Sequence, residues 1–136
     1  MVAVEQNDVL ANYLQSVGAK IFRGSELDLV DRYYKAAISV SADEIVRVCA
    51  DNPLICASEI DNLINYFHQN QCDYAYNQKP IGNNYPDGLG AEICKTNLVE
   101  EIFEKSTDPN HREHLFNYIW GNQHKYNIRT FNPVKD

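Results

Sequence analysis

The stretch Ile45-Val-Arg-Val-Cys-Ala-Asp-Asn-Pro53 decides the fold. Its first half is short, β-branched and mostly apolar, which is typical of a strand that is covered on both faces. Asp51-Asn-Pro53 should end the strand, because these residue types favour turns. Asp51 would then stand at the carboxyl end of a strand, which is where ligands of open α/β sheets bind.

Strand and helix patterns alternate on both sides of this stretch. Alternating or β-branched runs predict further strands over residues 20–22, 73–77, 91–95 and 126–131. Apolar residues at helical spacing predict helices over residues 8–17, 28–40, 97–105 and 109–123, and one that starts near residues 58–61. This order predicts one domain over residues 1–136, a three-layer α/β/α fold with a largely parallel sheet.

Capping residues mark where the helices should begin. Asp8 can cap the first helix, and Ser25 with Asp28 forms an S-x-x-D start for the second. Ser58 with Asp61 offers a similar start, and Asp108 precedes a proline that suits the first helical turn. Between the helices, residues 78–90 carry two prolines and three glycines, so we expect a long irregular loop there.

The bulk composition narrows the class of protein. A formal charge of −7 argues against a general nucleic-acid binder, although a divalent cation can bridge acidic side chains to the phosphates of a nucleotide. No apolar run is long enough to span a membrane, and the first residues lack the features of a signal peptide, so we expect a cytoplasmic protein. The four cysteines show no CxxC spacing, which argues against a structural zinc site.

Asp51 is the first candidate for chemistry. An exposed carboxylate after a strand could hold Mg²⁺, which keeps some water ligands and shares its other positions with substrate phosphates. The alternative is that Asp51-Asn-Pro53 only makes a turn.

A second candidate is the segment Tyr85-Pro-Asp-Gly-Leu-Gly-Ala-Glu92. Its glycines let the backbone approach a ligand, while Asp87 and Glu92 could bind sugar hydroxyls or complete a metal site. The alternative is a turn followed by an edge strand.

Two helices carry weaker candidates. Arg32, next to Asp31, could bind a phosphate in a forked geometry, or it could form an ordinary ion pair on a solvated helix face. His111 and His114 are three residues apart, but a zinc site would need further ligands that spacing does not identify, so a surface cluster is the alternative.

Five segments together are similar to a known family. They are Phe22-Arg-Gly-Ser-Glu26, Asp31-Arg-Tyr-Tyr34, Arg47-Val-Cys-Ala-Asp-Asn-Pro-Leu54, Tyr85 to Glu92, and Arg112-Glu-His114. In this order they resemble the spore-coat polysaccharide biosynthesis cytidylyltransferases, relatives of the acylneuraminate and 3-deoxy-manno-octulosonate cytidylyltransferases. The resemblance implies a Rossmann-like nucleotide-diphospho-sugar transferase fold. It also implies Mg²⁺-dependent transfer of CMP from CTP to a sugar acid, with release of pyrophosphate.

The resemblance also implies roles for individual residues. Asp51 matches the metal-binding aspartate of the family, and this match favours a role in metal binding over a role only in the turn. Asp51 and Arg32 are the implied catalytic residues. The implied substrate-binding residues are Asp31, Asn52, Asp87, Gly88, Glu92, Glu113 and His114.

One departure from the family pattern shapes the functional expectation. The family's strand and glycine- and arginine-containing loop, which hold the triphosphate, have no counterpart here, so the fold should be incomplete at the N-terminus. We therefore expect weak or no activity from this chain alone, and a homo-oligomer or a partner chain that covers an exposed sheet edge. Alternatives are a non-catalytic nucleotide-sugar binding or assembly module, half of a split enzyme, or a glycosyltransferase, although no Asp-x-Asp motif is present.

Overall fold

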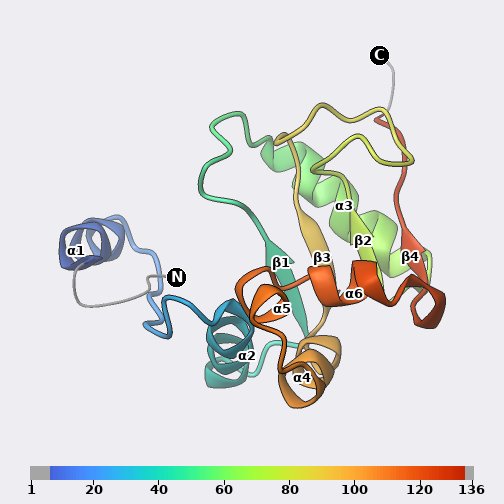
Figure 1. Cartoon of the computed structure of the whole chain (residues 1–136). Coiled ribbons are helices and arrows are strands. Elements are labelled where there is room, and N and C mark those ends of the chain that lie inside the picture. Colours follow the sequence, from blue (N-terminus) through green and yellow to red (C-terminus); the bar gives the residue numbers. More distant parts are fainter. Residues whose placement is uncertain (1–6, 134–136) are drawn as a thin grey trace. The chain divides into compact units, whose positions relative to one another are not determined.

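The structure is a computed structural model that describes residues 7–133 (Figure 1). Its elements in chain order are α1 (Asp8–Ser16), α2 (Leu29–Ser39), β1 (Glu44–Arg47), α3 (Ala57–Gln69), β2 (Tyr74–Tyr76), β3 (Glu92–Lys95), α4 (Thr96–Lys105), α5 (Pro109–Glu113), α6 (Asn117–Gly121), η2 (Gln123–Lys125) and β4 (Ile128–Arg129). Among the described residues, unit 1 runs up to Asp43 and resumes over Thr96–Gly121, while unit 2 holds Glu44–Lys95 and the residues from Asn122 onward. No helix in the described part of the chain has the length and apolar character needed to cross a membrane.

Unit 2 contains the sheet, whose strand order is β1-β3-β2-β4. β3 runs antiparallel to both β1 and β2, and the β2–β4 pairing is parallel. β1, β2 and β4 thus run in the same direction. The prediction of a largely parallel sheet was nevertheless wrong, because two of the three strand pairings in the described sheet are antiparallel. The physical reason lies in residues 77–91, which connect β2 to β3 without a helix; a parallel neighbour needs a crossover that usually contains one.

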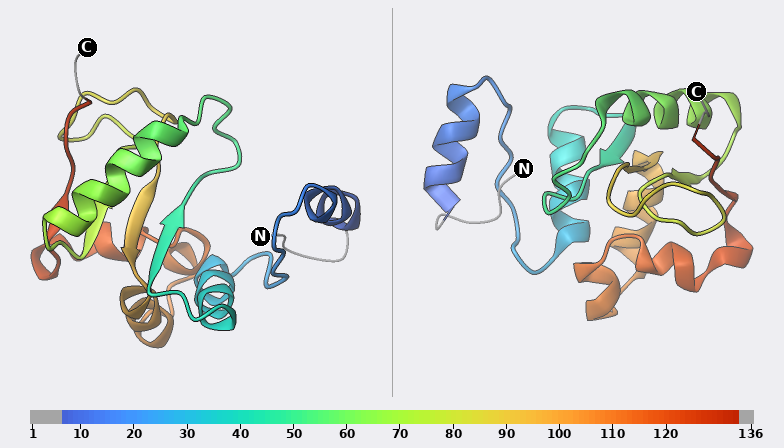
Figure 2. Two further views of the ribbon diagram at one scale, coloured as in Figure 1. Left: turned by 180° about the vertical axis from the view of Figure 1, so that it is seen from behind. Right: turned by 90° about the horizontal axis from the view of Figure 1, so that it is seen from above.

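Helix α3 packs on β2 and β3 and closes the core of unit 2 (Figure 2). Apolar side chains recur along α3 at helical spacing, so one stripe can face the sheet. The buried members of this core are Leu63, Phe67, Cys72, Ala75, Ala91 and Ile93. A sheet with a helix packed on it confirms the mixed α/β class.

Unit 1 is helical, with α2 packed on α4 and α5 and with α5 in contact with α6. Val30, Leu98, Val99 and Ile102 are buried on these helices. Asp28 caps α2 by accepting a hydrogen bond from the Asp31 amide at 2.9 Å, and Asp108 caps α5 in the same way through the Asn110 amide.

The cap at Asp108 was predicted from the sequence. For α2 the sequence predicted an S-x-x-D start, and Ser25 Oγ accepts from the Asp28 amide at 3.0 Å, while Asp28 itself is the cap. Asp8 was expected to cap α1 but is its first residue.

Three predicted element boundaries were wrong. Residues 20–22 do not form a strand, and the predicted helix over 109–123 is interrupted between α5 and α6. Helix α3 starts at Ala57 after Cys56, which gives no side-chain cap, so Ser58 lies inside the helix rather than before it.

Candidate functional site

Asp51 and Asn52 lie in the turn that follows β1. The Asp51 side chain is exposed and makes no hydrogen bond or ion pair with residues 7–133. The Asn52 side chain instead faces the 78–90 loop: a Cβ added to Gly88 would lie 3.0 Å from Asn52 Oδ1. Gly88 has φ +79°, a left-handed conformation that favours glycine. The structure thus brings two predicted site residues, Asn52 and Gly88, into contact.

The 78–90 loop is fixed at both ends by hydrogen bonds. Asn77 is fully buried; its Oδ1 accepts from the Ala91 amide and its Nδ2 donates to the Glu59 carbonyl, both at 2.9 Å. Gly90 lies so close that an added Cβ would come within 2.1 Å of Asn77 Oδ1. The Gly88 amide donates to the Gln78 carbonyl at 2.7 Å. These contacts hold the backbone next to Asp87 in one conformation, with the Asp87 side chain exposed.

Tyr85 anchors the middle of the same loop. Its ring is buried, and its hydroxyl donates to Glu59 Oε2 at 2.5 Å. Burial, and then the hydrogen bond to Glu59, raise the pKa of Tyr85 above its usual value. Tyr85 therefore stays protonated and remains a donor to the carboxylate of Glu59.

Glu92 is the buried carboxylate of unit 2, with 3% of its surface exposed. Arg47 lies opposite it in the β1–β3 register and forms an ion pair with Oε2. The Tyr74 hydroxyl donates to Oε1 at 2.5 Å. Because protein groups engage both oxygens, a sugar hydroxyl would have to share the carboxylate with them. Glu92 as a substrate contact stays a prediction.

Lys79 was not singled out in the sequence, although it is the sole cation between residues 78 and 90. Its ammonium lies 5.7 Å from the centroid of the Tyr76 ring. Burial lowers the pKa of Lys79, while the charges of Glu92 and Asp87 act in the opposite direction. Lys79 therefore places a half-buried positive charge on the loop that carries Asp87 and Gly88.

Asp31 and Arg32 belong to unit 1, where they do not pair with each other. Asp31 binds Lys35 at 2.7 Å, one helical turn further along α2. Arg32 Nη1 donates to the Ser25 carbonyl at 2.9 Å, and its buried Nε has no partner among the described residues. The alternative interpretation, an ordinary ion pair of Arg32 on a helix face, is therefore not what unit 1 shows.

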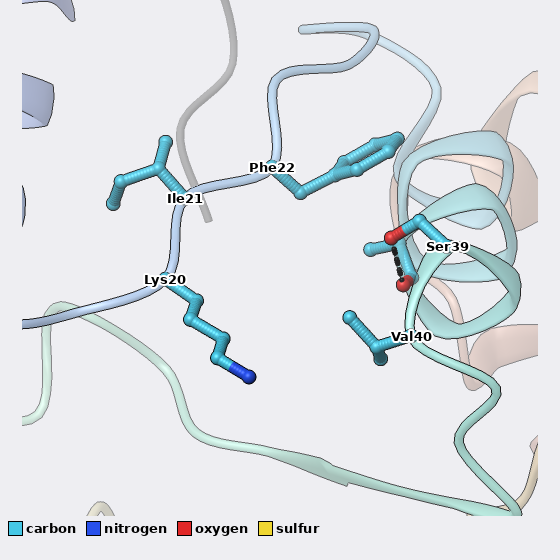
Figure 3. A pocket seen from close by; sticks show the side chains of 6 residues that line it. Lys20, Ile21, Phe22, Ser39 and Val40 are labelled. Atoms are coloured by element: carbon cyan, nitrogen blue, oxygen red, sulfur yellow. Dashed lines mark hydrogen bonds between the residues drawn. The ribbon is translucent and has the colours of Figure 1, made fainter.

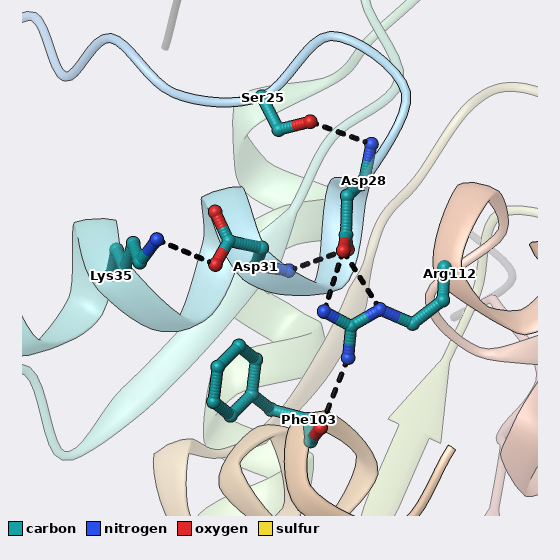
Figure 4. A network of polar contacts seen from close by, with 6 residues as sticks. All are labelled: Ser25, Asp28, Asp31, Lys35, Phe103 and Arg112. Carbon is teal, nitrogen blue, oxygen red and sulfur yellow. Dashed lines mark hydrogen bonds and ion pairs between the residues drawn. The ribbon is translucent and has the colours of Figure 1, made fainter. Parts of the chain in front are cut away.

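Arg112, adjacent to the predicted pair Glu113 and His114, has a structural role in unit 1 (Figure 4). Its Nε and Nη2 donate to Asp28 Oδ2 at 2.8 and 2.5 Å, and Nη1 donates to the Phe103 carbonyl at 3.0 Å. Glu113 and His114 are exposed where α5 ends.

The histidine pair and the metal expectation can also be placed. His111 points to Ser106, 3.2 Å away, and lies edge-on to the Tyr118 ring. Within residues 7–133, no three His, Cys, Asp or Glu side chains gather as a metal site would require. Mg²⁺ needs fewer protein ligands, because it uses one or two carboxylates together with water and phosphates.

Comparison with solved structures identifies the class of protein. A cytidylyltransferase from Leptospira borgpetersenii superposes on 98% of the chain with a TM-score of 0.84 and 28% identity, and the match covers 55% of that protein. The fold is therefore that of a Rossmann-like nucleotidyltransferase. A family model for cytidylyltransferases matches residues 4–135, and the chain belongs to the cytidylyltransferase family.

Two curated relatives extend the comparison. An uncharacterized protein of Methanocaldococcus jannaschii is 30% identical over 95% of the chain. The spore coat polysaccharide biosynthesis protein SpsF of Bacillus subtilis is 28% identical over 92% of the chain. The matches cover 51% and 50% of these proteins, so the chain spans about half the length of the curated relatives it matches.

Proposed function

We propose that the chain serves a cytidylyltransferase that transfers CMP from CTP to a sugar acid in surface polysaccharide synthesis, in the cytoplasm. Family membership supports the transfer of a cytidylyl group, and the name of SpsF supports the polysaccharide context. The observation that carries the proposal is the exposed Asp51 carboxylate, in the turn whose next residue contacts Gly88 of the 78–90 loop.

The residues after β1 fit a magnesium ion. Asp51 offers a hard oxygen ligand that is open to solvent and engaged by no described residue, which leaves room for water and phosphate oxygens around the ion. Bound there, Mg²⁺ would neutralise charge on the triphosphate. We assign Asp51 as its protein ligand.

Cations of the chain would hold the anionic substrates. Arg32 Nη1 donates to a backbone carbonyl, no carboxylate within residues 7–133 pairs with its side chain, and a guanidinium fork matches a phosphate. Lys79 lies on the same loop as Asp87 and Gly88, so it would attract the carboxylate of a sugar acid. Asp87 would accept hydrogen bonds from sugar hydroxyls.

The experiment compares Asp51→Asn with Asp61→Asn, an exposed aspartate on α3 that serves as the matched control. Calorimetry measures CTP binding with and without Mg²⁺, and pyrophosphate release measures turnover with candidate sugar acids. Mg²⁺-dependent binding should fall about 100-fold in Asp51→Asn and stay unchanged in the control. Retention of Mg²⁺-dependent binding by Asp51→Asn would remove Asp51 from the metal site.

The alternative function is a non-catalytic nucleotide-sugar binding module, which keeps the fold of the family without turnover. The two functions differ in turnover. A module would bind a CMP-sugar with no pyrophosphate release under any of the assay conditions, whereas even slow Mg²⁺-dependent release would support the transferase.

A further inference from the structure

Three segments of unit 2 leave the sheet at one edge (Figure 1). β1, β2 and β4 run in the same direction, because β3 is antiparallel to β1 and β2 while β4 is parallel to β2. Their carboxyl ends therefore lie at the same edge, where open α/β sheets bind ligands. The turn with Asp51 follows β1, the 78–90 loop follows β2, and the strap (residues 130–132) follows β4. The fold thus delivers the strap to the edge that carries the candidate site.

The strap binds the first half of the loop through two polar side chains. The Thr130 hydroxyl donates to the Tyr76 carbonyl at 2.7 Å and accepts from Asn83 Nδ2 at 2.7 Å. Asn132 adds a second contact, because its Oδ1 accepts from the Asn84 amide at 2.9 Å. Asn83 is therefore tied to a residue that lies 47 positions further along the chain.

Phe131 connects the strap to the buried anchor of the loop. Its ring stacks on Tyr66 of α3 with centroids 4.6 Å apart, and it meets the Tyr85 ring edge-on at 5.4 Å. Both are favourable arrangements for aromatic pairs. The Tyr66 hydroxyl also donates to the Thr130 carbonyl at 3.1 Å, which holds the strap on the helix. Phe131 therefore contacts α3 and also Tyr85, whose hydroxyl binds Glu59 of the same helix.

The loop needs such contacts, because residues 78–90 form neither a helix nor a strand. A segment that samples many conformations loses entropy when a ligand orders it, and this loss weakens binding. A loop that the rest of the fold has already ordered does not carry that cost when it binds. The strap can therefore raise the affinity for a ligand without touching it.

We propose that Thr130, Phe131 and Asn132 are positioning residues, which hold the 78–90 loop in the conformation that binds the sugar acid. The identity of this ligand rests on the proposed function. In that function Lys79 and Asp87 of the loop contact the sugar acid, and the polar partners of the strap lie between these two residues in the sequence.

Thr130→Val tests the proposal, and Thr130→Ser is its rescue. Valine removes the hydroxyl that serves two hydrogen bonds, whereas serine keeps it. Amide exchange without ligand should become about tenfold faster over residues 82–90 in the valine variant and stay within about twofold of wild type in the serine variant. Calorimetry with N-acetylneuraminate and 3-deoxy-manno-octulosonate as probes should show about tenfold weaker binding to the valine variant, with Mg²⁺-dependent CTP binding unchanged.

Thr96→Val is the matched control. The Thr96 hydroxyl donates to the Ala42 carbonyl at 2.6 Å, and both residues belong to unit 1. The same chemical change there removes a similar hydrogen bond that does not involve the loop. It should leave loop exchange and sugar-acid binding unchanged, so a general effect of lost stability would show itself in both valine variants.

Unit 1 also has an open hollow of about 360 Å³ (Figure 3). Its walls are Lys20, Ile21, Phe22, Ala36, Ser39 and Val40. The Ser39 hydroxyl donates to the Ala36 carbonyl at 2.7 Å, so Lys20 is the wall residue that could attract a carboxylate. Lys20→Met should leave sugar-acid binding unchanged. Loss of binding in this variant would move the ligand to the hollow and overturn the proposal.

Unchanged loop exchange in Thr130→Val would also overturn the proposal, and so would a loosened loop that binds the sugar acids as tightly as wild type does. If Thr130→Val does not fold, the exposed Asn132 gives a second test. Asn132→Leu removes the acceptor of the Asn84 amide and should speed exchange there and weaken binding, whereas Asn132→Asp keeps an oxygen acceptor and should do neither.

The proposed function can fail separately. If neither sugar acid binds the wild-type chain, the proposed acceptor is wrong. Faster ligand-free exchange in Thr130→Val, with rescue by Thr130→Ser, would still support the hold of the strap on the loop.

Discussion

The Arg47–Glu92 pair allows the contribution of a buried ion pair to the free energy of unfolding to be measured. Arg47 and Glu92 have side chains that are 22% and 4% exposed, and the Tyr74 hydroxyl also donates to the carboxylate. Removing one partner of a buried pair leaves the other charge unpaired, which costs about 3–5 kcal/mol. Glu92→Leu and Arg47→Met should each lower the free energy of unfolding by about that amount.

Removing both charges should cost much less than the sum of the single changes. The double variant leaves neither charge of this pair behind, and its main loss is the Tyr74 hydrogen bond, worth about 1–3 kcal/mol. The coupling energy between the two positions should therefore exceed about 2 kcal/mol.

Urea unfolding followed by far-UV circular dichroism measures these values. Lys105→Met breaks an exposed pair with Glu101 and should change stability by less than about 1 kcal/mol, which makes it the control. Additive single effects, or a Glu92→Leu variant as stable as wild type, would refute the reasoning.

Two further predictions concern unit 2. Gly90→Ala would place its Cβ against Asn77 and should lower the free energy of unfolding, measured in urea, by more than about 3 kcal/mol. The control is Gly18→Ala, at φ +86° with open space around it, which should cost about 1 kcal/mol. Equal costs of the two substitutions would contradict the tight contact at Gly90. The hydrogen bond with Ser58, and then the one from the Glu59 amide, lower the pKa of the Cys56 thiol. Its reaction with iodoacetamide should therefore reach half its maximal rate at a lower pH than the reaction of an ordinary thiol does. Ser58→Ala should move that midpoint to higher pH, and an unchanged midpoint would argue against the hydrogen bond.

Local chemistry made part of the fold predictable. Asp108 caps its helix as expected, and the S-x-x-D segment from Ser25 to Asp28 does precede α2, with Asp28 as the cap. The run from Ile45 forms β1 because its apolar, β-branched residues suit a pleated surface. These features depend on neighbours in sequence, which is why a pattern can reveal them.

Pairing between distant segments was harder to predict. The direction of β3 depends on how the chain returns after residue 77, and residues 20–22 are not among the strands of the described sheet. The site shows the same division. The turn at Asp51 was placed correctly, whereas the engagement of Glu92 depends on Arg47, 45 residues away. The sequence of a motif does not reveal whether its carboxylate contacts a ligand or an arginine of the same chain.

Asp28 divides its two oxygens between two tasks. Oδ1 holds the first turn of α2, and Oδ2 holds Arg112, 84 residues further along the chain. Because one side chain serves both, losing this carboxylate would remove the cap of α2 and the partner of the Arg112 guanidinium at the same time. A change at the start of α2 would therefore also be felt at α5.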